Sequence, residues 1–131
     1  MQVKNVIRLI CCTLMAVFLS CQSGTGQTEL EPAEAKQKME QQPDVMLLDV
    51  RTPEEFAEGR LQGAVNMDVQ EDSFADKITM LDSSKTYIVY CRSGSRSHAA
   101  AKMISKNGFT VYVLKGGILA WMEKKYPVVK D

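Results

Sequence analysis

The chain has 131 residues, of which 45% are hydrophobic and 24% charged, so its length and composition are those of one globular domain with a short appendage. Its 16 basic and 16 acidic residues balance, which argues against a nucleic-acid partner. No internal repeat is present, so a repeat architecture is excluded.

The first 20 residues have the pattern of a secretory signal peptide. Lys4 and Arg8 make the start basic, residues 9–19 are almost wholly apolar, and a small residue, Ser20, ends the run. This apolar segment is too short for a membrane-spanning helix, which needs about 20 residues. We therefore expect residues 1–20 to be removed on export.

The end of this segment, Phe18-Leu19-Ser20-Cys21, resembles a bacterial lipobox. The resemblance implies that Cys21 is acylated and becomes the mature N-terminus, with residues 21–28 as a flexible tether to a domain at 29–131. We expect a membrane-anchored lipoprotein facing the periplasm or the cell surface. The alternative is a soluble periplasmic protein cut near the same position.

The cysteines then separate into two groups. Cys11 and Cys12 lie in the signal segment and Cys21 would carry lipid, which leaves Cys91 as the one free thiol of the mature chain. A disulfide framework is therefore excluded. An unpaired thiol in an oxidising compartment indicates a reactive cysteine rather than a structural one.

The mature chain alternates helices and strands. We expect a helix that opens at residues 29–32 and is broken at 41–44, followed by a strand over 45–50 whose continuous apolar run is typical of burial on both faces. Thr52 is a candidate N-cap, with Pro53 as the first helical residue and Glu54 and Glu55 in the first turn.

The second half repeats this alternation. Predicted strands cover residues 64–67, 86–90 and 109–114, and predicted helices cover 73–81 and 99–106. The pattern predicts an α/β fold with a central parallel sheet of about five strands and helices on both faces. Ligands of such sheets bind at the carboxyl ends of the strands, where Cys91 follows the strand at 86–90.

The segment after this strand can hold an anion. Cys91 is followed by Arg92, Ser93, Gly94, Ser95, Arg96 and Ser97, and then by a helical pattern. Free N–H groups at the helix start and in the loop would favour the thiolate, which is the nucleophilic form of cysteine. Two arginines would lower the pKa of the thiol further and bind an anionic substrate.

These residues resemble the active-site loop of the rhodanese family in its Cys-x-x-Gly-x-Arg form. Two further stretches resemble the family: Asp49-Val50-Arg51 with Glu55-Phe56 and Gly59 to Ala64, and Gly116-Gly117 with Trp121. One position departs from the family pattern, because Arg60 stands where the family usually carries His, and we expect that change to affect packing or local polarity.

The resemblance implies a rhodanese-like fold and a sulfurtransferase, most simply one that uses thiosulfate. Cys91 would take sulfane sulfur as a persulfide and pass it to cyanide or a thiol, without any metal or organic cofactor. The loop from Arg92 to Ser97 would bind the small anionic donor. The other partner would be the membrane, through the lipid on Cys21, and we expect a monomer.

Four side chains have two interpretations each. Asp49 and Arg51 either form a local charged pair or help to hold the Cys91 loop. His98 is either a general base for an acceptor thiol or an ordinary exposed residue in the first helical turn. Trp121 is expected to pack in the core rather than bind a cofactor.

Two other functions stay open. A Cys-based phosphatase or arsenate reductase shares the cysteine, loop and arginine arrangement, but its loop has five residues between Cys and Arg, whereas four separate Cys91 from Arg96. A persulfide carrier or a partner-docking module without turnover is the second alternative.

Overall fold

The computed structural model describes residues 27–131, so the predicted signal peptide and the lipidation site at Cys21 lie outside the described residues. The strands are β1 (Glu29–Leu30), β2 (Val45–Asp49), β3 (Val65–Asn66), β4 (Thr86–Tyr90) and β5 (Thr110–Leu114). The helices are α2 (Pro32–Gln41), α3 (Pro53–Glu58), α4 (Phe74–Thr79), α5 (Ser95–Lys106) and α6 (Gly117–Glu123). Within residues 27–131, no helix has the length and apolar character needed to cross a membrane.

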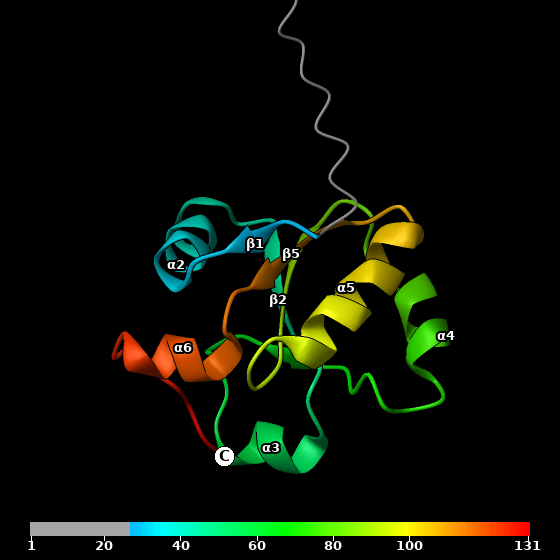
Figure 1. The fold of residues 1–131 in the computed structure, drawn as a ribbon. Helices are drawn as coiled ribbons and strands as arrows, with labels where there is room; N and C mark the ends of the chain where they lie inside the picture. Colours follow the sequence, from blue (N-terminus) through cyan, green and yellow to red (C-terminus); the bar gives the residue numbers. More distant parts are fainter. Residues whose placement is uncertain (1–26) are drawn as a thin grey trace, which may run out of the picture.

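The strands form one parallel sheet in the order β1-β5-β4-β2-β3, with α2 and α6 on one side and α4 and α5 on the other (Figure 1). This arrangement confirms the predicted α/β fold. The central strand β4 lies between β2 and β5, so its carboxyl end is surrounded by the loops that follow its neighbours. Those loops build the site described below.

Both faces of the sheet are covered by helices, so residues 27–131 form two hydrophobic cores. Successive residues of one strand pack alternately into one core and the other. Leu48 and Val89 belong to the core under α4 and α5, whereas Leu47 and Ile88 belong to the core under α2 and α6. A strand that is covered on both faces needs apolar residues at successive positions. This explains why residues 45–48 are a continuous apolar run, which ends at Asp49.

The first helix begins later than the sequence indicated. Residues 29–30 form the edge strand β1, in which Leu30 is paired with Leu114 of β5. The helix starts at Pro32 and is capped by Glu31 and Glu34, each of which uses its side chain to accept a hydrogen bond from the other's backbone. A strand of two residues is too short to show an alternating pattern, so the expected opening over residues 29–32 was too early by about three residues, although Pro32 does stand in the first helical turn.

Helix α5 begins earlier than predicted, at Ser95 and not at residue 99. Gly94 is its N-cap and has a φ of 121°, a conformation that a residue with a Cβ rarely adopts. Ser95, Arg96 and Ser97 therefore belong to the first helical turn, and the connection after β4 is only residues 91–94. This first turn consists of polar residues, so the sequence shows no helical spacing of apolar residues there that could have predicted it.

Candidate active site

Cys91 lies directly after β4, and only 1% of its surface is exposed. Its carbonyl oxygen accepts a hydrogen bond from the Ile118 N–H at 2.9 Å, and the Arg92 carbonyl accepts one from the Leu119 N–H at 3.2 Å. The first turn of α6 thus holds the backbone on which the thiol sits.

Gly117 permits this close approach. A Cβ at this position would lie 2.5 Å from the carbonyl oxygens of both Cys91 and Arg92, and its φ of 62° is also unfavourable for other residues. The chain turns sharply at Gly116-Gly117, where both residues have positive φ. Its function in the fold is to let α6 contact the loop.

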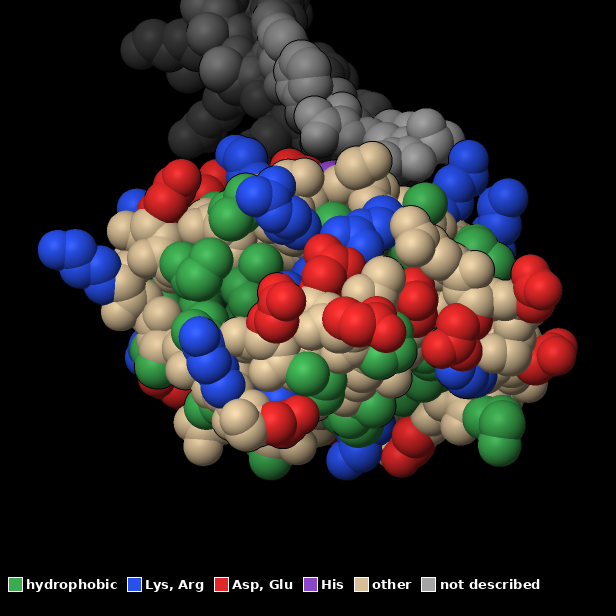
Figure 2. Space-filling view, turned by 90° about the horizontal axis from the view of Figure 1, so that it is seen from below, with side chains coloured by type: hydrophobic (Ala, Val, Ile, Leu, Met, Phe, Trp, Pro, Cys, Tyr) green, Lys and Arg blue, Asp and Glu red, His purple; other side chains and the backbone are tan. Residues whose placement is uncertain are grey.

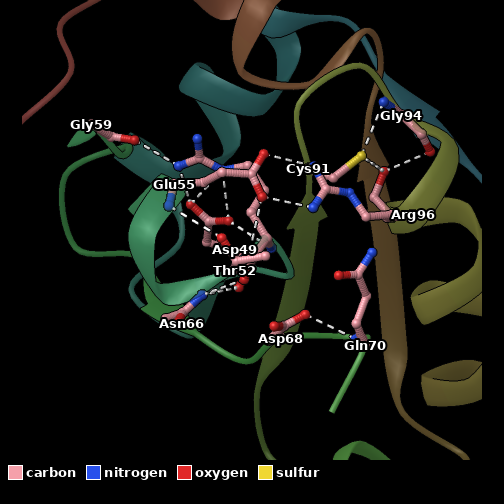
Figure 3. Close-up of polar contacts among 12 residues, drawn as sticks. Asp49, Thr52, Glu55, Gly59, Asn66, Asp68, Gln70, Cys91, Gly94 and Arg96 are labelled. Atoms are coloured by element: carbon pink, nitrogen blue, oxygen red, sulfur yellow. Dashed lines mark hydrogen bonds and ion pairs between the residues drawn. The ribbon is translucent and has the colours of Figure 1, made fainter. Parts of the chain in front are cut away.

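The sulfur atom faces the inside of the loop, toward donors (Figure 3). The Gly94 N–H donates to Cys91 Sγ at 3.1 Å, and the Ser97 hydroxyl lies 3.5 Å from the same atom. Ser97 is fully buried and also donates to the Gly94 carbonyl at 2.8 Å. The loop therefore provides a compact, polar surrounding for one sulfur atom.

These donors determine the ionisation of the thiol. Burial by itself raises the pKa of Cys91, but the hydrogen bonds of the Ser97 hydroxyl and of loop N–H groups outweigh burial and hold the pKa below the ordinary 9.0. The N–H groups belong to Ser93, Gly94 and Ser97. The thiolate is therefore more populated near neutral pH than in an ordinary cysteine.

Arg96 is held by a glutamate from another helix. Its guanidinium makes two hydrogen bonds, of 2.7 and 2.8 Å, to the carboxylate of Glu55 on α3 (Figure 3). The pairing with Arg96 lowers the pKa of Glu55 to about 2. The ion pair joins α3 to the first turn of α5 beside the Cys91 loop.

The other side chains of residues 91–97 are more open. Arg92, Ser93 and Ser95 are exposed, and the Arg92 side chain makes no hydrogen bond or ion pair with any other residue of the range 27–131. Arg92 lines a cavity of about 290 Å³ together with Arg51, Glu55, Glu58, Gly59, Ile118, Leu119 and Met122. The view from the side of α3 shows basic and acidic side chains intermingled beside a hydrophobic group (Figure 2).

Asp49 and Arg51 form a buried ion pair, with Arg51 Nη2 lying 2.6 Å from Asp49 Oδ2. Arg51 also donates to the Gly59 carbonyl at 2.6 Å, and the Asn66 amide donates to the backbone carbonyls of Asp49 and Arg51. These bonds fix the connection from β2 to α3. Among the described hydrogen bonds, none joins the pair directly to residues 91–97, so its effect on the loop is through the placement of α3.

His98 contacts the loop through its ring. Nδ1 lies 2.7 Å from the Gly94 carbonyl, and Nε2 lies 2.8 Å from the carboxylate of Glu29 in β1. The ring is about half exposed, at 43% of its side-chain surface. Both nitrogens already have partners in this arrangement, which leaves neither free to act as a base.

The remaining predicted positions are structural. The Arg60 guanidinium lies over the Phe56 ring and donates to Asp131 at 2.6 Å, a role in packing and local polarity as expected. Trp121 is buried in the core and its indole N–H donates to the Pro127 carbonyl at 3.0 Å. The prediction that Trp121 packs in the core is confirmed.

Sequence reasoning missed two acidic side chains of the site. Glu55 was expected only to lie in the first turn of α3, where its charge is favourable to the helix dipole, although its position in a family-like motif was a usable signal. Asp68 is buried, accepts the Gln70 N–H at 2.9 Å, and its charge acts on Arg96. Asp68 stands in a loop with no recognisable pattern, so no local signal pointed to it.

Comparison with known proteins identifies the family of this chain. Residues 31–124 match the rhodanese-like domain family. The chain is 35% identical over 99 residues, 76% of its length, to the putative sulfurtransferase YtwF of Bacillus subtilis, of which 94% is covered. It is 31% identical over 102 residues to the thiosulfate sulfurtransferase GlpE of Glaesserella parasuis, covering 77% of this chain and 92% of that protein.

A solved structure is also similar. The rhodanese-related protein of Thermoplasma volcanium superposes with a TM-score of 0.72 at 30% identity, covering 79% of this chain and 99% of that one. The family match spans most of the chain, including the strand, loop and helix that hold Cys91. The chain belongs to the rhodanese-like domain family, whose relatives include sulfurtransferases.

Proposed function

We propose that this protein transfers sulfane sulfur from thiosulfate, or a similar small anion, to a thiophilic acceptor through a persulfide on Cys91. The observation that carries the proposal is the placement of Cys91 Sγ among hydrogen-bond donors of its own loop, with Gly94 N at 3.1 Å and Ser97 Oγ at 3.5 Å. The relative named thiosulfate sulfurtransferase supports the choice of donor.

The reaction has two steps. The Cys91 thiolate attacks the outer sulfur of thiosulfate, forming an S–S bond on the enzyme while the S–S bond of thiosulfate breaks and sulfite leaves with that electron pair. Cyanide or a thiolate then attacks the outer sulfur of the persulfide, forming thiocyanate or a new persulfide and returning Cys91 as thiolate. Each step conserves charge and needs no cofactor.

The loop acts on both steps. Its N–H groups stabilise negative charge on the thiolate and on the persulfide, because preorganised donors need no rearrangement when the charge develops. Arg92, exposed and free of partners among the described residues, provides a positive charge for the sulfonate part of the donor. Arg96 retains its positive charge in the pair with Glu55 and contributes to the local potential.

The first test is the intact mass of the purified protein before and after thiosulfate. We expect a gain of about 32 Da, one sulfur atom, that is lost on addition of cyanide and absent from Cys91→Ser. Saturable turnover with thiosulfate and cyanide would distinguish an enzyme from a carrier, which would receive its sulfur from a partner protein and not from thiosulfate alone. No gain with thiosulfate, mercaptopyruvate or polysulfide would refute the sulfurtransferase function and turn attention to phosphate and arsenate.

We also propose that the protein is exported and held at a membrane by lipid on Cys21. The support is the basic, apolar and small-residue pattern of residues 1–20 followed by the lipobox-like sequence. Growth with labelled palmitate, followed by purification of the protein and of Cys21→Ser, tests it. Label in the first and none in the second is the expected result, and equal label in both would refute it.

A further inference from the structure

The Gly94 carbonyl is the acceptor for an unusual number of donors. It receives the His98 N–H at 3.1 Å as the first hydrogen bond of α5, the Ser97 hydroxyl at 2.8 Å, and the His98 ring at Nδ1 at 2.7 Å. A carbonyl oxygen has two lone pairs, so three donors exceed what it needs. One of the two side-chain donors can therefore leave without exposing an unsatisfied group.

The donor that can leave is the Ser97 hydroxyl. Ser97 has a single hydroxyl hydrogen, and this hydrogen can go either to the Gly94 carbonyl, at 2.8 Å, or to Cys91 Sγ, at 3.5 Å. With a Cys91 thiol, the S–H donates to Ser97 Oγ while Ser97 donates to Gly94. With a thiolate, the sulfur is only an acceptor, and the Ser97 hydrogen must turn to it to stabilise the charge.

We infer that His98 is a positioning residue that makes this turn of the Ser97 hydroxyl favourable. When Ser97 donates to the thiolate, the His98 ring continues to donate to the Gly94 carbonyl, which stays satisfied in its buried position. Without the ring, Ser97 would be drawn to the carbonyl and the thiolate would lose part of its stabilisation. His98 acts through Ser97 and does not itself contact the sulfur in the described hydrogen bonds.

The opposite side of the ring keeps it in place. Nε2 lies 2.8 Å from Glu29, whose carboxylate can only accept, so the imidazolium form donates from both nitrogens at once. The charged groups beyond Glu29 are Lys115 and its partner Glu31, while the neighbouring Arg96 is directed to Glu55. β1, far from Cys91 in the sequence, is thereby linked to the loop.

The inference is tested by the reactivity of Cys91 with iodoacetamide from pH 5 to pH 9, followed on the Cys91 peptide by mass spectrometry so that other cysteines do not contribute. Alkylation needs only the thiolate and no sulfur donor, so this result is independent of the mass test above. The importance of His98 for turnover, in contrast, rests on the proposed function. Below the midpoint, the rate measures the thiolate fraction.

We expect His98→Ala to lower the alkylation rate at pH 6 by about three- to tenfold while leaving the plateau at high pH unchanged. Ser97→Ala should show a similar fall, and adding His98→Ala to Ser97→Ala should cause no further fall, because the hydroxyl through which His98 acts is absent. His98→Asn, which retains an amide donor at the position of Nδ1, should recover most of the wild-type rate.

Two results would overturn the inference. One is an unchanged profile in His98→Ala, and the other is an equal effect of His98→Ala with and without Ser97. Thermal unfolding of each variant shows that the fold is retained. Should His98→Ala not fold, His98→Phe, which fills the space of the ring but has no donor, replaces it in the two Ser97 backgrounds, and an equal fall of the rate in both would exclude action through Ser97.

Discussion

The ion pair of Glu55 and Arg96 gives a prediction whose size follows from the structure. Glu55→Gln removes the charge but keeps an oxygen that can accept the Thr52 N–H, as the carboxylate does at 3.0 Å. The pKa of Glu55 is lowered from 4.5 to about 2 by Arg96, and such a difference corresponds to at most about 3 kcal/mol of stability. With 25% and 28% of the two side chains exposed, solvent screening reduces the expected loss at pH 7 to about 1–2 kcal/mol.

The sign of the pH dependence is fixed by the lowered pKa. A carboxylate that is more acidic in the folded state stabilises the protein above its unfolded value of 4.5, and this contribution disappears as the pH falls toward about 2. The difference between wild type and Glu55→Gln should therefore be largest near neutral pH. At pH 3 it should be less than half of its value at pH 7.

Urea unfolding followed by Trp121 fluorescence at pH 7 and pH 3 measures both values. The matched control is Glu54→Gln, which removes an exposed carboxylate from the same helical turn and leaves the contacts of Glu55 intact. We expect Glu54→Gln to cost less than about 0.5 kcal/mol. Equal losses for the two variants, or a Glu55→Gln loss that does not shrink at pH 3, would refute the assignment of this energy to the ion pair.

Three further changes have defined outcomes. Gly117→Ala should destabilise the protein by more than about 2 kcal/mol, because the added Cβ forces α6 away from the loop. Gly63 also has a positive φ but has open space around it, so Gly63→Ala should lower the stability by less. Thermal unfolding of the two variants measures the difference. Tyr90→Phe removes the hydroxyl that accepts the Leu61 N–H at 3.1 Å and should cost about 1–2 kcal/mol in urea unfolding. Titration of Cys91 by thiolate absorbance should give a midpoint below 9.0 that rises in Ser97→Ala, and a midpoint that is unchanged would contradict the role of this hydroxyl.

Much of the fold and the position of the candidate nucleophile could be predicted from local sequence. A strand buried on both faces needs a continuous apolar run, so 45–50 and 86–90 were recognisable, and Thr52-Pro53 marked the start of α3 because capping involves only neighbouring residues. Cys91 was recognisable for the same reason, since strand, loop and helix follow one another directly. Such features depend on residues within a few positions of each other.

What the tertiary structure decided involves partners that are far apart in the chain. Glu55 meets Arg96 only because α3 and α5 both begin at the carboxyl edge of the sheet, and Glu29 meets His98 only because β1 pairs with β5. Neither pairing leaves a local pattern, since the strand order β1-β5-β4-β2-β3 is set by packing and not by sequence proximity. The sequence by itself thus determined the class of fold and the position of the Cys91 thiol at the end of a strand, whereas only the packed sheet determined which charges surround that thiol.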